Sequence, residues 1–254
     1  MRRARSRAGV TLVELLAAIT LVSLLSVGIL YAMRTALVTL ERTNDKLLAN
    51  RRVLGAQRIL DQQVSNMISV RAICGGPRDE YGIGGVQFFH GEQFQMRFVS
   101  RYSVQLAGRG GPMVLEFAVI PGENGRGVRL IVNELPYGGP STVEPLCVGY
   151  DMDSNGSMNG KFPPVQARQG SFVVADKLAY CRLSYQVFQP VDGQKRWSPR
   201  FGGYLPPSAI RVEMAPLEPD SSRLQMTSTT IPVRIFRNSR VNYVDLDEKP
   251  QIYQ

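Results

Sequence analysis

The sequence predicts an α+β protein in which one long N-terminal α-helix, over about residues 11–72, packs on antiparallel β-sheet. First, all 16 prolines lie at position 77 or later and only three of the 24 glycines precede residue 75, so little in the first third of the chain breaks a helix. Second, apolar residues in this third recur at helical spacing, whereas after residue 77 they alternate with polar residues as in strands. Third, no run of roughly 10–15 residues with helical spacing separates the strands, which disfavours a parallel sheet.

The positive charge of the chain is concentrated at its N-terminus. The 254 residues carry a net charge of +9, but residues 1–9 contribute four arginines and no acid, whereas residues 77–254 hold 19 basic and 17 acidic side chains. A nucleic-acid-binding domain would gather positive charge on one face of the folded part, so we expect no nucleic-acid partner. With 44% hydrophobic residues the chain has the material for a core, which excludes an intrinsically disordered protein.

Residues 10–33 form an apolar run that is long enough to cross a membrane. Eighteen of these 24 residues are apolar, and a helix of this length spans about 36 Å, against roughly 30 Å of hydrocarbon. Because four arginines precede the run, the positive-inside rule predicts that the N-terminus stays in the cytoplasm and that the rest of the chain crosses. The run is too long for a secretory signal peptide, and no A-x-A-like cleavage site follows it.

Glu14 is the one acidic residue in this run. A carboxylate within a bilayer costs about 2.5–3.5 kcal/mol on insertion scales, so such residues are rare and usually have a partner. One interpretation places Glu14 near the interface, where its side chain reaches water. The other is that the carboxylate awaits a specific cation.

Residues 7–16 (RAGVTLVELL) resemble the processing site of type IV prepilins and pseudopilins. In that family a short basic leader ends in Gly, a membrane-embedded prepilin peptidase cuts after it and methylates the new N-terminal residue, and the fifth mature residue is Glu. The resemblance implies a pilin-like fold, cleavage between Gly9 and Val10, and methylation of Val10, although Val10 stands where Phe or Met is usual. It also implies an assembly role for Glu14, whose carboxylate would pair with the Val10 amine of a neighbouring subunit.

The pattern divides the chain into four segments. Residues 1–9 are the predicted leader, 10–33 the membrane-spanning and filament-core helix, 34–76 an amphipathic helix, and 77–254 a β-rich periplasmic domain. We expect the Gly and Pro residues at 75–77 to end the helix. The apolar stripe of the amphipathic part follows mostly three-, four- and seven-residue steps and consists of Leu37, Leu40, Leu47, Leu54, Leu60, Val64, Met67 and Ile68.

The order of features after the helix resembles the J-type minor pseudopilin of type II secretion systems. Residues 137–170 have no clear counterpart in it and are interpreted as an insertion. The resemblance implies a place at the tip of a periplasmic pseudopilus anchored in the inner membrane, with I-type and K-type minor pseudopilins and the major pseudopilin as partners. The features that carry it are the predicted strands at 114–119, 183–188, 210–214 and 231–236, together with residues 98–100, Trp197 and residues 204–207.

Two other functions remain open. One is a minor pilin of a type IV surface pilus, serving adhesion, pilus priming or DNA uptake; the near-neutral charge of residues 77–254 argues against DNA uptake but not against adhesion. The other is a membrane-anchored enzyme, which would need a clustered site around His90, the only histidine, or around the acidic residues of 151–153. Because no G-x-S-x-G or comparable nucleophile motif is present, we expect no enzymatic activity.

Residues 151–156 (DMDSNG) match the first half of an EF-hand calcium loop, in which Asp151, Asp153 and Asn155 would supply oxygen ligands. The twelfth position, which should be a bidentate Glu, is Phe162. An Asx-rich turn explains the same residues. Calcium is therefore the one cofactor that the sequence suggests, and none is required.

The three cysteines lie beyond the apolar run, and so in an oxidising compartment if that run crosses the membrane. At most one internal disulfide can form. We expect Cys147–Cys181, because Cys74 closes the predicted helix. Three free thiols are the alternative.

Overall fold

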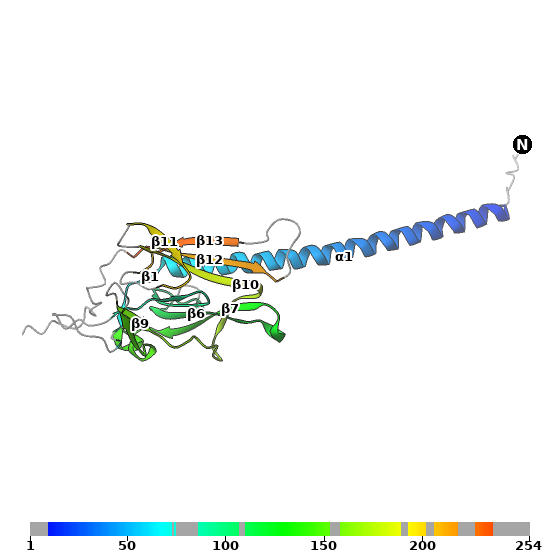
Figure 1. Ribbon diagram of the computed structural model, residues 1–254. Coiled ribbons are helices and arrows are strands. Elements are labelled where there is room, and N and C mark those ends of the chain that lie inside the picture. The colour runs from blue at the N-terminus through cyan, green and yellow to red at the C-terminus, as the bar shows by residue number, and fades with distance from the viewer. Residues whose placement is uncertain are drawn as a thin grey trace, which may run out of the picture. The chain divides into compact units, whose positions relative to one another are not determined.

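The fold is known from a computed structural model. It describes residues 10–72, 74, 86–106, 110–152, 158–188, 193–201, 206–217 and 227–235. The chain divides into two units, residues 1–48 and residues 49–254, and helix α1 (Leu12–Ser65) begins in the first and ends in the second. Figure 1 labels α1 and several of the strands.

The first unit consists of the N-terminal part of α1, whose apolar side chains are exposed. The segment Leu12–Asn44 is long and apolar enough to cross a membrane, and none of it is buried against other parts of the protein. Serine hydroxyl groups in it are satisfied locally: those of Ser23 and Ser26 donate to the carbonyl oxygens of Ile19 and Val22, each at 2.8 Å. Such bonds to the preceding turn let a hydroxyl lie in an apolar environment without an unsatisfied donor.

In the second unit, the last turns of α1 pack on a β-sheet through a narrow apolar stripe. Val53, Ala56, Leu60 and Val64 are buried in one core with residues of the sheet, and their steps of three and four residues keep them on one helix face. Leu54, which the sequence assigned to the stripe, is 55% exposed. The six-residue step from Leu54 to Leu60 corresponds to about 600° of rotation, or 240° away from the buried face, so that assignment was wrong.

Helix α1 ends at Ser65, and not near residue 72 as predicted. Asn66 ends it: its backbone N–H and its side-chain amide both donate to the carbonyl oxygen of Gln62, at 3.2 and 2.8 Å. The chain then pairs with the sheet, because Met67 and Ile68 form β1 opposite Ser100 and Val99. Pairing with a distant strand overrides a pattern that is compatible with a further helical turn.

All strand pairs in the described part of the chain are antiparallel, as the sequence predicted, and nine strands form one sheet. The main path runs β1–β5–β6–β7–β10–β12–β13, with β4 beside β5 and β11 beside β10. Two small sheets, β2–β3 and β8–β9, complete the architecture. The strands are β1 (Met67–Ile68), β2 (Arg71–Ala72), β3 (Val86–Gln87), β4 (His90–Glu92), β5 (Gln95–Ser100), β6 (Met113–Pro121), β7 (Val128–Pro136), β8 (Gly149–Met152), β9 (Met158–Lys161), β10 (Phe172–Phe188), β11 (Lys195–Ser198), β12 (Ala209–Pro216) and β13 (Thr227–Pro232).

Strand β10 connects the two halves of the large sheet. It is 17 residues long, pairs with β7 through its first part, and pairs with β12 from Leu178 onward. The register shifts around Leu178, and Lys177 has a left-handed φ of 51°, as expected where a strand bends at bulges. The last strand, β13, covers residues 227–232, so the prediction of a strand at 231–236 began four residues too late.

The two faces of the sheet have different cores. The inner face, which packs on α1, carries Phe98, Phe117 and Leu183. The outer face carries Val99 and Val114, because successive side chains of a strand point to opposite faces. The outer core is covered in part by residues 137–170, which contain α2 (Pro140–Val143), 3₁₀-helix η2 (Glu144–Leu146) and the hairpin β8–β9. Another 3₁₀-helix, η1 (Glu123–Gly125), connects β6 and β7.

Candidate functional site: the N-terminal segment of helix α1

Helix α1 begins with a cap that fixes the position of Glu14. The backbone N–H of Glu14 donates to the carbonyl oxygen of Thr11 at 3.1 Å and to its hydroxyl oxygen at 3.3 Å. Thr11 is thus the N-cap residue, and Glu14 stands three residues later, which is the Thr-x-x-Glu spacing of a capping box. The carboxylate therefore belongs to the first, well-defined turn of the helix. Val10 immediately precedes this turn, and Gly9 lies outside the described residues.

The surroundings of Glu14 are apolar and exposed. Leu12, Val13 and Leu15 flank it, and each is more than half exposed. A negative charge is favourable at a helix N-terminus, where the backbone N–H groups are unpaired and the helix dipole is positive. Among the described residues no cation pairs with Glu14, and its described neighbours are apolar.

The N-terminal segment matches one known family model. Residues 4–30 match the prokaryotic N-terminal methylation motif, which contains the predicted cleavage site and Glu14. No curated protein matches the chain. The motif, together with a long apolar helix followed by antiparallel sheet, gives the chain a prepilin-like N-terminal segment and a pilin-like arrangement of its elements. The resemblance to prepilins noted in the sequence is confirmed at this level, and the proteins that carry the motif have a structural role.

The predicted calcium loop is only partly described. Asp151 lies in β8, where its carboxylate pairs with the Lys161 ammonium at 2.6 Å across the β8–β9 hairpin. Asp153 and Asn155 lie outside the described residues. Within the described ranges, no group of three or more Asp, Glu, His or Cys side chains could hold a metal ion. Calcium binding at residues 151–156 stays a prediction, and the one ligand that is described already has a counter-charge.

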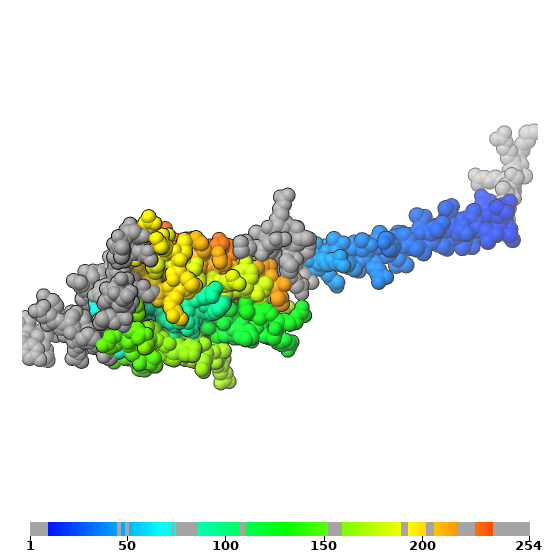
Figure 2. Space-filling model, in the orientation of Figure 1, coloured from blue at the N-terminus to red at the C-terminus, as the bar shows by residue number. Residues whose placement is uncertain are grey.

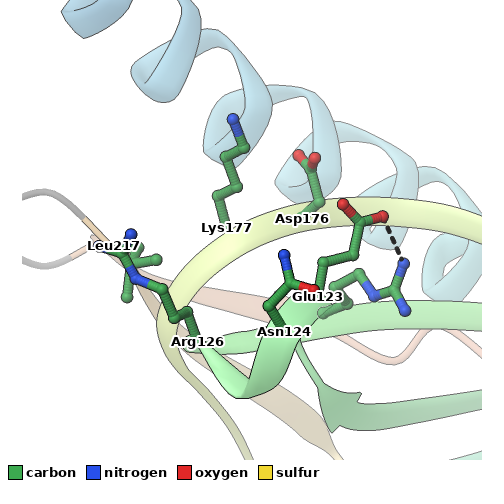
Figure 3. A pocket seen from close by; sticks show the side chains of 7 residues that line it. Glu123, Asn124, Arg126, Asp176, Lys177 and Leu217 are labelled. Carbon is green, nitrogen blue, oxygen red and sulfur yellow. Dashed lines mark hydrogen bonds and ion pairs between the residues drawn. The ribbon is translucent and has the colours of Figure 1, made fainter.

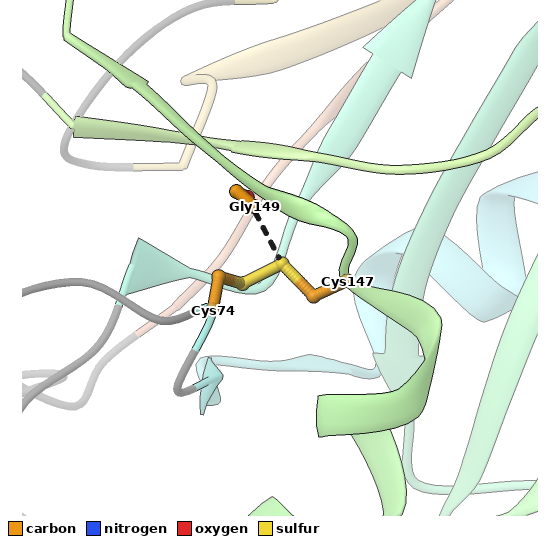
Figure 4. The surroundings of a disulfide bond; sticks show 3 residues. All are labelled: Cys74, Cys147 and Gly149. Atoms are coloured by element: carbon orange, nitrogen blue, oxygen red, sulfur yellow. Dashed lines mark hydrogen bonds between the residues drawn. A yellow bond between two sulfur atoms is a disulfide. The ribbon is translucent and has the colours of Figure 1, made fainter.

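The disulfide joins Cys74 to Cys147 (Figure 4), and the predicted Cys147–Cys181 pair is wrong. The Cα atoms of Cys74 and Cys147 are 5.4 Å apart, and both residues belong to the outer-face core. Cys181 lies on the inner face of β10 in line with Leu183 and Tyr185, so the sheet separates it from Cys147. The alternation of apolar residues at 181, 183 and 185 assigns Cys181 to the inner face. This signal could have excluded Cys181 as the disulfide partner of Cys147.

His90 is located at the start of β4, as a strand-end histidine. Its ring lies 3.5 Å from a carboxylate oxygen of Glu92 and 3.5 Å from a guanidinium nitrogen of Arg97. Burial and the nearby charge of Arg97 lower the pKa of His90. None of its hydrogen-bonding or ion-pair partners in the described part of the chain is a Ser, Thr or Cys, so these contacts assemble no nucleophile–base pair.

A surface cavity of about 200 Å³ lies between η1 and the bend of β10 (Figure 3). Its two acidic side chains are both paired: Glu123 with Arg129 at 3.1 Å, and Asp176 with Arg52 of α1 at 3.3 Å. Arg126 and Lys177 also line the cavity, so its described lining carries two acidic and three basic side chains. Among its described lining residues there is no histidine, cysteine, serine or threonine that could act as a nucleophile or a neutral base.

Proposed function

We propose that this protein is a minor pseudopilin, a structural subunit at the tip of the periplasmic pseudopilus of a type II secretion system. In this proposal a prepilin peptidase cleaves between Gly9 and Val10 and methylates the Val10 amine. The apolar part of α1 anchors the chain in the inner membrane, with the N-terminus cytoplasmic before cleavage and the β-rich domain in the periplasm. I-type and K-type minor pseudopilins and the major pseudopilin are the partners, and the protein catalyses no reaction.

The observation that carries the proposal is that Glu14, whose backbone N–H is capped by Thr11, places a carboxylate in the first turn of an exposed apolar helix that bears the methylation motif. Cleavage after Gly9 would place a new ammonium group on Val10, four residues before Glu14. Both charges would then lie at the same end of the helix, where each is costly if it remains unpaired in an apolar environment. Pairing of Glu14 with the Val10 ammonium of an adjacent subunit would remove both costs and set the axial register of the incoming subunit.

The first test separates processing from assembly. We expect Glu14→Gln, which keeps the shape of the side chain and removes its charge, to be cleaved normally but to enter filaments at least tenfold less efficiently. Mass spectrometry of the mature N-terminus reports cleavage and methylation, and cross-linking to the major pseudopilin reports incorporation. Glu41→Gln is the matched control, because Glu41 is an exposed carboxylate further along the same helix.

Accumulation of uncleaved Glu14→Gln precursor as the main defect would contradict the assembly role. A Gly9→Ala change should instead retain the leader while the β-rich domain folds normally. Loss of folding in that variant would mean that Gly9 has a structural role and would remove the support for the cleavage site.

A second experiment distinguishes a secretion pseudopilus from a surface pilus. The full-length protein, solubilised in detergent, is co-purified with I-type and K-type subunits from the same cell. A stable ternary complex supports the pseudopilin assignment. Absence of the complex, with the protein recovered instead in pili sheared from the cell surface, would assign it as a minor pilin.

A further inference from the structure

The outer face of the large sheet carries a row of polar side chains beneath a surface segment. Arg97 of β5, Glu116 of β6 and Asn133 of β7 are directly opposite one another on neighbouring strands, and each is at most 3% exposed. The guanidinium of Arg97 pairs with Glu116 at 2.7 Å, and the amide of Asn133 donates to Glu116 at 3.2 Å. Gln95 lies two residues before Arg97 in β5, and so on the same face of the sheet. We call these four residues the outer-face cluster.

Residues 162–171 cover the outer-face cluster without forming a strand or a helix. Most of their side chains are exposed, and Figure 2 shows this part of the chain, in yellow-green, at the surface next to the green strands. Arg97 donates to the carbonyl oxygen of Pro163 at 2.6 Å, and Asn133 donates to that of Gln166 at 2.9 Å. The N–H of Val165 donates to the side-chain oxygen of Gln95 at 2.8 Å. Side chains of the sheet thus bind the backbone of an extended segment.

Side chains toward the two ends of this segment also contact the surface; besides Phe162 and Arg168, the Ser171 hydroxyl donates to the side-chain oxygen of Asn133 at 2.5 Å. At one end, the ring of Phe162 lies 5.4 Å from that of Phe88 and 5.2 Å from that of His90. At the other end, the guanidinium of Arg168 pairs with Glu116 at 3.2 Å. Contacts to the backbone tolerate any sequence, whereas an aromatic slot and a buried carboxylate select for particular side chains. The surface therefore selects a peptide that has an aromatic residue and, six positions later, an arginine.

We expect the segment to detach from this surface without unfolding of the sheet. It contributes few buried apolar side chains, so polar contacts provide most of its attachment. The strands beneath it are joined to one another by antiparallel backbone pairing, and their inner face packs on α1. Segments with few buried apolar contacts open locally at a much smaller free-energy cost than a core strand. A buried ion pair also adds little net stability, and well-packed apolar residues would hold a permanently attached segment at least as strongly.

We propose that the outer-face cluster is a binding surface for an extended peptide with an aromatic residue followed six positions later by arginine. Residues 162–171 occupy it within the same chain, and a segment of a protein partner with this pattern replaces them. This inference goes beyond the filament role and does not depend on processing of the N-terminus or on Glu14.

The test uses the full-length protein in detergent and a fluorescent peptide with the sequence of residues 160–172. Arg168→Ala removes the exposed end of the internal contact and leaves the cluster intact. We expect this variant to bind the peptide at least tenfold more tightly than the wild type, measured by fluorescence anisotropy. Peptides that carry Phe162→Ala or Arg168→Ala should each bind at least tenfold more weakly than the parent peptide. Equal binding of the altered and parent peptides, or no binding by the Arg168→Ala protein, would overturn the proposal.

Hydrogen exchange on the unmodified protein provides an independent test. The Val165 amide should exchange at least 100-fold faster than the amides of Phe117 and Val132 in the strands beneath it, because only local opening is needed. Equal protection would mean that residues 162–171 leave only when the whole domain unfolds, and the proposal would then fail whatever the peptide does.

Discussion

The buried hydroxyl of Ser100 donates a hydrogen bond to the side-chain oxygen of Gln63 at 2.6 Å, and this bond ties helix α1 to strand β5. Both residues are almost fully buried. Ser100→Ala would leave the oxygen of Gln63 without its partner, and we expect the free energy of unfolding to fall by about 1–3 kcal/mol. Chemical denaturation of the detergent-solubilised protein measures this. Ser228→Ala, at an exposed position of β13, should change it by less than about 0.5 kcal/mol; equal effects of the two changes would exclude the buried bond as the cause.

Gly91 is required by the close approach of Tyr185. A Cβ atom at position 91 would lie 2.6 Å from the Tyr185 ring and 2.9 Å from Cβ of Phe201. The Tyr185 ring cannot move freely, because its hydroxyl donates to the carbonyl oxygen of Glu92 at 2.9 Å. We expect Gly91→Ala to lower the free energy of unfolding by about 1–3 kcal/mol through overpacking. Gly170→Ala is the control, since nothing lies within 4 Å of its added methyl group. If Gly91→Ala does not change the midpoint of chemical denaturation, the contact with Tyr185 relaxes and the prediction is wrong.

The Cys74–Cys147 disulfide should contribute strongly to stability, because the two residues are 73 positions apart. In the chain-entropy model, closing a loop of this length stabilises the folded state by about 4 kcal/mol. We expect the double variant Cys74→Ser/Cys147→Ser to lose roughly this amount in a denaturation experiment. Dithiothreitol should lower the free energy of unfolding of the unmodified protein to that of the variant, and it should leave the stability of the variant unchanged. A folded protein with three titratable thiols before any reduction would contradict the pairing.

Alkaline pH should destabilise the fold through Cys181. Burial raises the pKa of this thiol from 9.0 to about 12, so between these values the unfolded chain releases a proton that the folded chain keeps. The unfolded state then binds fewer protons, and the free energy of unfolding falls as pH rises, by up to about 1.4 kcal/mol per pH unit. Burial also raises the pKa of Tyr185 well above 10.0, and this acts in the same direction at higher pH.

Comparison of the unmodified protein with Cys181→Ala from pH 8 to 10 isolates this effect. We expect a smaller loss of stability with pH in the variant. Equal slopes would show that Cys181 titrates alike in the folded and unfolded states, contrary to its burial.

Local sequence patterns were sufficient for much of the fold. The absence of helix breakers before residue 75 predicted the long helix, and period-two alternation predicted antiparallel strands at 114–119 and 210–214, which β6 and β12 contain. The methylation motif was recognisable because its Gly, Glu and apolar residues stand at fixed short distances. Cleavage after Gly9 and the assembly role of Glu14 stay predictions.

Features that depend on distant partners could not be predicted in this way. The end of α1 is set by pairing of β1 with β5, a contact across about thirty residues. The outer-face cluster combines Arg97, Glu116 and Asn133, which individually resemble the polar residues of any half-exposed strand. Their burial follows from a segment whose sequence has no periodic signal. The disulfide was missed because connectivity depends on which face of a sheet each cysteine occupies, and this requires the register of β10.

The Cys74–Cys147 bond also determines how the protein responds to mechanical load. When the chain is pulled from its two ends, the 73-residue interval between the cysteines cannot extend while the bond is intact. At ~3.4 Å per residue, the disulfide keeps about 250 Å of contour length from extending when the chain unfolds. Strands β3 to β7 lie inside this interval, so a force that separates the rest of the chain leaves them within a closed covalent loop.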